Sequence, residues 1–191
     1  MLKTTINYEP VSKNPWKQLS NKRIYDNPWI QLEEDQVINP TGGQNQYGKV
    51  HFKNLAIAII PLDEEMNTWL VGQWRYPLDE YSWEIPMGGG LRTVDPLVSA
   101  QRELQEETGI TAASWELLLK IHTSNSVTDE TGFCYVAREL TFGSTAFDET
   151  EELAIRKLPF DKAVRMVMDG QITDSLSMAS ILKLDKMLRS S

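Results

Sequence analysis

The chain has few of the residues and runs that mark several other kinds of protein. It has a single cysteine, so no disulfide can form within it, and its two histidines are too few for a histidine-rich metal site. No run of about 18 apolar residues is present, the length that a membrane-spanning helix needs. The first residues contain no apolar stretch of the secretory type. We therefore expect a cytoplasmic protein that is not anchored in a membrane.

Clustered positive charge is also absent. The chain has 19 basic and 27 acidic residues, a formal net charge of −8. Surfaces that bind nucleic acid need grouped Lys and Arg to displace counterions from phosphates, so nucleic acid is not an expected partner. A small phosphorylated molecule remains compatible with an acidic protein, because metal ions and a few arginines can screen its charge.

The length of 191 residues suits one domain, or a compact domain with an added N-terminal element. Short aromatic and β-branched runs between turn signals predict hairpins over residues 16–53. Apolar runs predict further strands at 55–60, 69–76, 115–122, 132–140 and 154–158. Helical spacing of apolar residues predicts helices at 161–168 and 175–188. We expect a β-rich N-terminal element over residues 1–50 and a main domain over residues 51–191.

Several reactive or aromatic side chains have ordinary structural interpretations. Cys134 lies in an apolar run, which predicts a buried structural thiol. His51 and His122 are interpreted as residues of the sheet. Core packing is the leading interpretation for four aromatic residues near the N-terminus, with nucleobase stacking or a dimer interface as alternatives: Trp16, Tyr25, Trp29 and Tyr47.

An acidic segment at residues 102–110 indicates chemistry. Glu103, Glu106 and Glu107 are three or four residues apart across this segment, so on a helix the Cβ atoms of such pairs lie about 5–6 Å apart. Their repulsion costs only about 0.2–0.5 kcal/mol per pair on an exposed surface, and a solvated acidic face is therefore an alternative. A divalent metal is the stronger interpretation because of what precedes the segment.

The preceding residues predict a strand, a glycine loop and the start of a helix. A strand over residues 83–87 leads into three glycines at 88–90, which we predict to form a loop where backbone approaches a ligand closely. Asp95 is a good N-cap and Pro96 suits the first helical position. Gly109 marks the end of the helix. This arrangement favours metal-bridged phosphate as the ligand.

Residues 88–110 resemble the Nudix box. Its pattern is Gly, five residues, Glu, seven residues, Arg-Glu, an aliphatic residue, any residue, Glu-Glu, any residue, Gly and an aliphatic residue. Eight positions agree with it: Gly88, Arg102, Glu103, Leu104, Glu106, Glu107, Gly109 and Ile110. Val94 stands where the pattern has its first glutamate, which in the family supports the loop and the box arginine. Asp95, one residue later, would replace it either as a helix cap or as a partner of Arg102.

The resemblance implies Mg²⁺ or Mn²⁺ as cofactor, because both ions prefer hard oxygen ligands. It makes Glu103 and Glu107 the principal carboxylate ligands and Glu106 a ligand or part of the water network. The carbonyl near Met87 or Gly88 would be an additional oxygen ligand. Arg102 is expected to orient the box carboxylates; outside this motif, a simple ion pair would be the better interpretation.

Residues 72–77 and 83–86 resemble the ADP-ribose and nucleoside-diphosphate-sugar branch of the family. This implies that Arg75 contacts phosphate, with a surface ion pair to Asp79 or Glu80 as the alternative. Glu84 would contact a metal or a sugar hydroxyl.

The same resemblance implies that two further acidic segments belong to the site. In the cluster at 148–152, Glu151 falls in register with the general base or metal ligand of the branch, and Glu152 is the alternate. Asp129 and Glu130 lie in a loop that can approach substrate, and Glu130 is our candidate for contacting it.

The resemblance implies an α+β fold, a Nudix-type α/β/α sandwich with a mixed sheet. It also implies metal-dependent cleavage of ADP-ribose or a nucleoside diphosphate sugar into a nucleoside monophosphate and a sugar phosphate. A nucleoside-triphosphate or dinucleoside-polyphosphate hydrolase is one alternative, and a Nudix-fold nucleotide-binding module without turnover is another. Members of this branch often dimerise through the N-terminal sheet, so a homodimer is expected.

Overall fold

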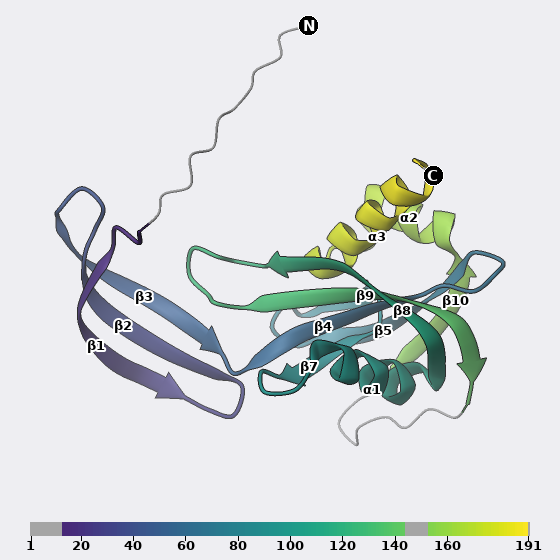
Figure 1. Ribbon diagram of the computed structural model, residues 1–191, viewed down its shortest axis with the longest axis horizontal. Helices are drawn as coiled ribbons and strands as arrows, with labels where there is room; N and C mark the ends of the chain where they lie inside the picture. The colour runs from purple at the N-terminus through teal and green to yellow at the C-terminus, as the bar shows by residue number, and fades with distance from the viewer. Residues whose placement is uncertain (1–12, 144–152, 191) are drawn as a thin grey trace, which may run out of the picture. The chain divides into compact units, whose positions relative to one another are not determined.

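A computed structural model of the chain describes residues 13–143 and 153–190. The described residues form ten strands and three helices. The chain divides into two compact units, Met1–His51 and Phe52–Ser191 (Figure 1). No helix within the described ranges is long and apolar enough to cross a membrane.

The N-terminal unit is a three-stranded sheet. Its strands β1 (Lys17–Asp26), β2 (Ile30–Ile38) and β3 (Gln44–Phe52) lie in that order, and β1 runs antiparallel to β2. One turn joins β1 to β2 and a second joins β2 to β3. The Asn27 side chain accepts hydrogen bonds from two backbone N–H groups of the first turn, and the Asn39 side chain does the same in the second.

The aromatic residues of this unit are not in a core, so that interpretation was wrong. Trp16 is 40% exposed, Tyr25 53% and Trp29 66%. Tyr47 is half-buried, and its ring centroid lies 5.4 Å from that of Trp16 in an edge-to-face contact. The reason is that residues 13–51 supply one sheet and no second layer to cover it, and every residue of β1 is exposed.

The second unit is built on two sheets. A mixed sheet has the order β7 (Met87–Leu91), β4 (Asn54–Pro61), β9 (Thr131–Phe142) and β8 (Ile110–His122), with β4 parallel to β9 and the other pairs antiparallel. An antiparallel sheet has the order β10 (Ala154–Pro159), β5 (Asn67–Arg75) and β6 (Glu80–Glu84).

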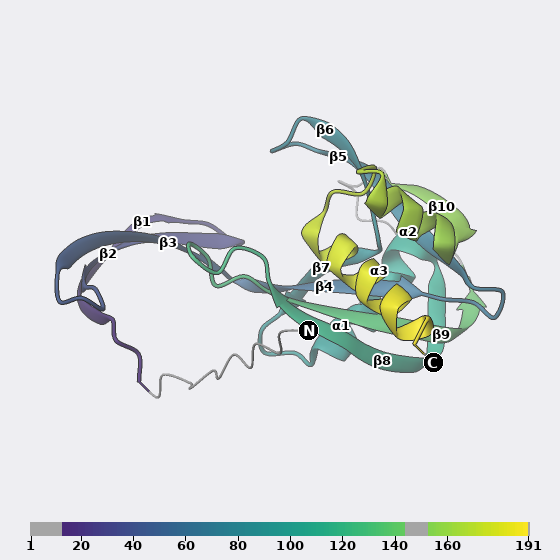
Figure 2. The same cartoon turned by 90° about the horizontal axis from the view of Figure 1, so that it is seen from above.

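Helices cover both sides of these sheets (Figures 1 and 2). The side chains of β4 alternate between the two layers, as the two-residue period of a strand requires. Ile57 and Ile59 pack in the core beneath α1 (Pro96–Thr108). Ala58 and Ile60 pack in the core beneath α2 (Phe160–Met168) and α3 (Ser175–Leu188). The predicted α/β/α sandwich with a mixed sheet is confirmed.

The three consecutive glycines form strand β7 and not the loop that we predicted. Gly88, Gly89 and Gly90 pair with residues of β4 in an antiparallel ladder. Glycine weakens a strand, yet it is needed where another element approaches closely. A Cβ at Gly90 would lie 2.8 Å from the Ile57 side chain and 2.9 Å from the hydroxyl of Ser99 on α1. The close packing of α1 and β4 therefore explains Gly90.

The predicted ends of α1 are confirmed. The Asp95 side chain accepts a hydrogen bond from the Leu97 backbone N–H at 2.9 Å, and Pro96 is the first helical residue. Gly109 has a left-handed conformation with φ 69° and ends the helix. Asp95 is therefore a helix cap, which resolves one of the two roles left open for it. Strand β8 begins directly after Gly109, earlier than the predicted residue 115.

Candidate active site

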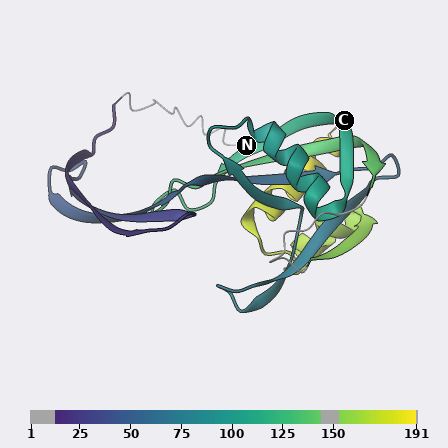
Figure 3. The ribbon, with the colours of Figure 1, turned by 90° about the horizontal axis from the view of Figure 1, so that it is seen from below.

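Helix α1 presses two carboxylates against strand β7. This helix crosses the face of the second unit that Figure 3 shows. Glu103 is 8% exposed and Glu107 4%, one helical turn apart. The Glu107 carboxylate accepts a hydrogen bond from the Met87 N–H at 2.9 Å. The Glu103 carboxylate fills the space beside Gly88, where an added Cβ would lie no farther than 2.5 Å from either carboxylate oxygen.

Arg102 connects this pair to the third box glutamate. Its guanidinium donates to Glu103 Oε1 at 2.5 Å, to Glu106 Oε2 at 2.5 Å and to the Gly89 carbonyl at 2.8 Å. Burial disfavours charge on Arg102, but the two carboxylates outweigh it and raise the pKa of the guanidinium above its ordinary value. A permanently charged arginine thus holds Glu103 and Glu106 beside the backbone of β7.

The oxygen donors of Glu103, Glu107 and the β7 carbonyls fit a hard divalent cation. The cradle that Gly88 leaves for the Glu103 carboxylate supports this fit. Glu106 is turned toward Arg102, and its side chain is 41% exposed. Within the described ranges, no three His, Cys, Asp or Glu side chains stand close enough to hold one metal ion together. Glu103 and Glu107 are thus the best placed of the predicted carboxylate ligands.

A pocket of about 380 Å³ lies beside Met87. It brings together the predicted substrate residues Arg75 from β5, Glu84 from β6 and Glu130 from the loop between β8 and β9. The start of α3 contributes polar groups that sequence reasoning missed: Thr173, Asp174 and Ser175. Asp174 caps α3 by accepting from the Ser177 N–H at 2.7 Å. The capping signal was readable in the sequence, but its place at a pocket was not.

At the wall of this pocket, half-buried Arg75 forms an ion pair with buried Glu84. Arg75 Nε donates to Glu84 Oε1 at 2.9 Å, and Nη2 contacts Oε2 of the same carboxylate. Glu84 is 3% exposed, and the hydrogen bond to it raises the pKa of Arg75. The partner that we named as an alternative, Asp79 or Glu80, was therefore wrong. Arg75 keeps a fixed positive charge facing the pocket.

The remaining predicted residues fall into three groups. Glu130 accepts a hydrogen bond from the Thr123 hydroxyl and lines the pocket. Asp129 accepts a hydrogen bond from the backbone N–H of Phe52, the last residue of β3, and does not line the pocket. Glu151 and Glu152 lie outside the described residues.

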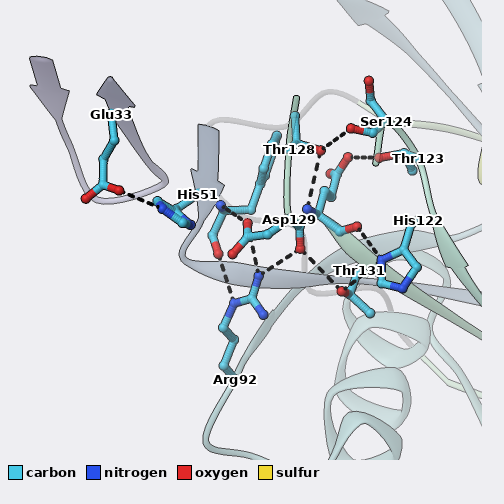
Figure 4. A network of polar contacts seen from close by, with 11 residues as sticks. Glu33, His51, Arg92, His122, Thr123, Ser124, Thr128, Asp129 and Thr131 are labelled. Carbon is cyan, nitrogen blue, oxygen red and sulfur yellow. Dashed lines mark hydrogen bonds and ion pairs between the residues drawn. The ribbon is translucent and has the colours of Figure 1, made fainter. Parts of the chain in front are cut away.

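The histidines and the cysteine have structural surroundings, as predicted. His51 Nε2 lies 2.9 Å from Glu33 Oε2 within the N-terminal unit, and His122 Nδ1 lies 3.3 Å from the Glu130 carbonyl (Figure 4). Cys134 is fully buried, and burial raises the pKa of its thiol to about 12. A thiol with that pKa is not a nucleophile at neutral pH.

The chain is similar in sequence to several known proteins. ADP-ribose pyrophosphatase of Mycobacterium tuberculosis is 30% identical over 178 residues, which cover 90% of this chain and 84% of that protein. Methanol dehydrogenase activator of Bacillus methanolicus is 31% identical over 167 residues, covering 86% and 90%. ADP-ribose pyrophosphatase of Bacillus subtilis is 27% identical over 161 residues, covering 83% and 86%.

A solved structure and two family models complete the comparison. The crystal structure of an ADP compounds hydrolase superposes with a TM-score of 0.83 at 18% identity, covering 94% of this chain and 97% of that one, which shows the shared fold. Residues 16–50 match the nucleoside diphosphate sugar hydrolase N-terminal domain, and residues 52–175 match the NUDIX domain. The chain therefore belongs to the Nudix family, with the acidic helix α1 in its catalytic domain, and is a hydrolase acting on phosphoric anhydrides.

Proposed function

We propose that the enzyme hydrolyses the diphosphate bond of ADP-ribose or a related nucleoside diphosphate sugar, releasing a nucleoside monophosphate and a sugar phosphate. The observation that carries this proposal is a pocket lined by the half-buried Arg75 and by Met87, whose backbone N–H donates to the Glu107 carboxylate. A diphosphate bound there would meet Arg75 and the acidic helix together. The names of two relatives and the match of residues 16–50 support the substrate class.

Mg²⁺ or Mn²⁺ is the proposed cofactor. Glu103 and Glu107 would hold it, with Glu106 and the Met87 carbonyl as further donors. When bound, such an ion supplies positive charge against the non-bridging phosphate oxygens. Arg102 would keep Glu103 and Glu106 oriented through the hydrogen bonds described above.

In the proposed reaction a water oxygen attacks one phosphorus and the P–O–P bridge breaks. Each side chain of the pocket has its own proposed role in this reaction. Arg75 binds phosphate oxygens, for which its planar fork is suited. Glu84 holds that guanidinium in place and is the candidate contact for a sugar hydroxyl, together with Glu130. The proton of the attacking water would pass to a glutamate. Candidates for this base are Glu106 and Glu107 in the box, and Glu151 or its alternate Glu152 outside the described residues.

We also propose that the protein is a cytoplasmic homodimer joined through its N-terminal sheets. The N-terminal unit leaves large apolar side chains exposed: Trp16, Leu19, Ile24, Tyr25 and Trp29. Covering such side chains removes apolar area from water, at about 25 cal/mol per Å². Light scattering would give the mass of a dimer, and charged substitutions at Ile24 and Trp29 would shift it toward that of a monomer.

The test of the reaction is product analysis with Mg²⁺ and a panel of ADP-ribose, nucleotide sugars, nucleoside triphosphates and dinucleoside polyphosphates. Cleavage of the sugar substrates is expected, with loss in Glu107→Gln and retention in Glu116→Gln, the same change at an exposed position on β8. Preferred cleavage of triphosphates or dinucleoside polyphosphates would show instead a nucleoside-triphosphate or dinucleoside-polyphosphate hydrolase. Tight binding by calorimetry without any product would favour a binding module.

A further inference from the structure

The side chains of Arg92 and Asp129, which come from two different loops, both hydrogen-bond the backbone of Phe52 (Figure 4). Arg92 lies in the turn between β7 and α1, and Asp129 lies in the loop of residues 123–130 between β8 and β9. The Asp129 carboxylate accepts a hydrogen bond from the Phe52 backbone N–H at 2.8 Å. Arg92 Nε donates to the Phe52 carbonyl at 2.9 Å. The backbone N–H and carbonyl of Phe52, the first residue of the second unit, are therefore both hydrogen-bonded.

The two side chains also bind each other. Arg92 Nη2 lies 3.5 Å from Asp129 Oδ1 and donates to the Asp129 carbonyl at 3.3 Å. Their side chains are 38% and 46% exposed, so the ion pair by itself contributes little. The full set of contacts requires an arginine more strictly than the ion pair alone does. Only the planar guanidinium of arginine reaches two carbonyls and a carboxylate at once. We call these contacts among Arg92, Asp129 and Phe52 the Arg92 clamp.

The clamped loop continues into the substrate pocket. Asp129 is followed directly by Glu130, whose carboxylate accepts from the Thr123 hydroxyl and lines the pocket. The Glu130 N–H donates to the Thr128 hydroxyl at 3.4 Å, and the Thr131 hydroxyl donates to the Asp129 carbonyl at 3.3 Å. The place of Glu130 therefore depends on a loop whose anchor to the rest of the unit includes Arg92.

The other end of the clamp leads to the acidic helix. Arg92 precedes the α1 cap, Asp95, by three residues. Val94 stands between them and has no polar side-chain group that could anchor the turn. The Arg92 side chain therefore supplies an anchor at the entry to α1.

We propose that Arg92 is a positioning residue, which acts through Asp129 to fix the loop at 123–130 and so the place of Glu130 in the substrate pocket. Arg92 does not line the pocket. The effect on substrate rests on the proposed function, whereas the fixing of the loop does not.

The test compares Arg92→Ala, Arg92→Lys, Asp129→Asn and the double variant Arg92→Ala/Asp129→Asn. Arg165→Ala, an exposed arginine on α2, is the matched control. Steady-state kinetics with ADP-ribose at saturating Mg²⁺, hydrogen exchange of residues 123–130 and thermal unfolding are measured for each.

Arg92→Ala should raise KM about fivefold, the scale of one charge-assisted contact at a partly exposed site, and change kcat less than about twofold. Arg92→Lys should fall between the wild type and Arg92→Ala, because lysine keeps the charge and loses the fork. The double variant should resemble Arg92→Ala, since both changes break one network. Exchange at 123–130 should rise in all of these variants, and Arg165→Ala should match the wild type.

The proposal would be overturned if Arg92→Ala left both KM and the hydrogen exchange of residues 123–130 unchanged. It would also be overturned if the increase in KM in the double variant equalled the product of the increases in the two single variants. A fall in kcat as large as the rise in KM would also overturn it. If Arg92→Ala does not fold, Arg92→Lys and Asp129→Asn carry the same comparison. If the wild type cleaves no ADP-ribose, the proposed function fails, and exchange at 123–130 alone then supports or overturns the clamp.

Discussion

Replacing Gly88 with alanine should displace the Glu103 carboxylate while the fold stays intact. Gly88 pairs with Ile57 in the β4–β7 ladder, and its φ is not positive, so alanine introduces no backbone strain. The new Cβ would lie no farther than 2.5 Å from either Glu103 oxygen. Since ordinary contacts begin near 3.5 Å, the carboxylate has to move by about 1 Å.

That movement sets the size of the effect. The displaced carboxylate loses its 2.5 Å contact with Arg102 and its place in the candidate metal site. A misplacement of about 1 Å in a reacting site can cost about 100-fold, so kcat/KM should fall by about that factor, or about 2.7 kcal/mol. Unfolding free energy should change by no more than about 1 kcal/mol, because the group that moves is the end of a flexible side chain.

The neighbouring glycines provide two controls. At Gly89 the nearest atom to an added Cβ is the Asn54 side-chain nitrogen at 3.3 Å, so Gly89→Ala should keep activity and stability. Gly90→Ala would press on Ile57 and Ser99 in the core and should lose stability instead. Turnover, calorimetric Mg²⁺ titration and thermal unfolding separate these outcomes. The reasoning is refuted if Gly88→Ala binds Mg²⁺ and turns over substrate within about threefold of Gly89→Ala.

Three further predictions concern the Arg75–Glu84 pair, the Lys49–Asp35 pair and Cys134. Arg75→Lys should raise KM for ADP-ribose about tenfold, because lysine cannot make the paired contacts with Glu84; an unchanged KM in steady-state kinetics would contradict this. Lys49→Met should destabilise the N-terminal unit by about 3 kcal/mol in urea unfolding at pH 7, because Asp35 is 5% exposed and Lys49 is its cationic partner. Although burial pushes the pKa of Asp35 upward, hydrogen bonds from Lys49 and Asn21 hold it below its ordinary 3.8. That stabilisation is complete above pH 3.8 and is lost as the pH falls through the lowered pKa, so the difference between the wild type and Lys49→Met should shrink in acid. Cys134 should react with a thiol reagent at pH 8 only after denaturation, and rapid labelling of the native protein would contradict its burial.

Local signals in the sequence predicted much of the fold. The N-cap Asp95, the helix end at Gly109 and the apolar periods of the strands and C-terminal helices act over a few residues, and the structure has each of them. The spacing of Glu103 and Glu107 likewise requires only a helix to bring them to one face. The family pattern was readable for the same reason, since its residues lie in one uninterrupted stretch.

Other features depended on partners far away in the chain. Gly88, Gly89 and Gly90 form a strand because β4 pairs with them and α1 packs closely on Gly88 and Gly90, although three glycines alone favour a loop. Arg75 binds Glu84 although Glu80 lies directly opposite it in the β5–β6 ladder, so neither closeness in sequence nor strand register alone predicts the partner.

The sequence by itself therefore determined the acidic helix, its caps and the family, since those rest on contacts within a few residues. Tertiary structure alone decided which carboxylates are buried, that Arg75, Glu84 and Glu130 line one pocket, and that Arg92 and Asp129 meet at Phe52. The physical reason is that burial and long-range hydrogen bonds arise only when distant segments pack, and no local pattern specifies which segments those are.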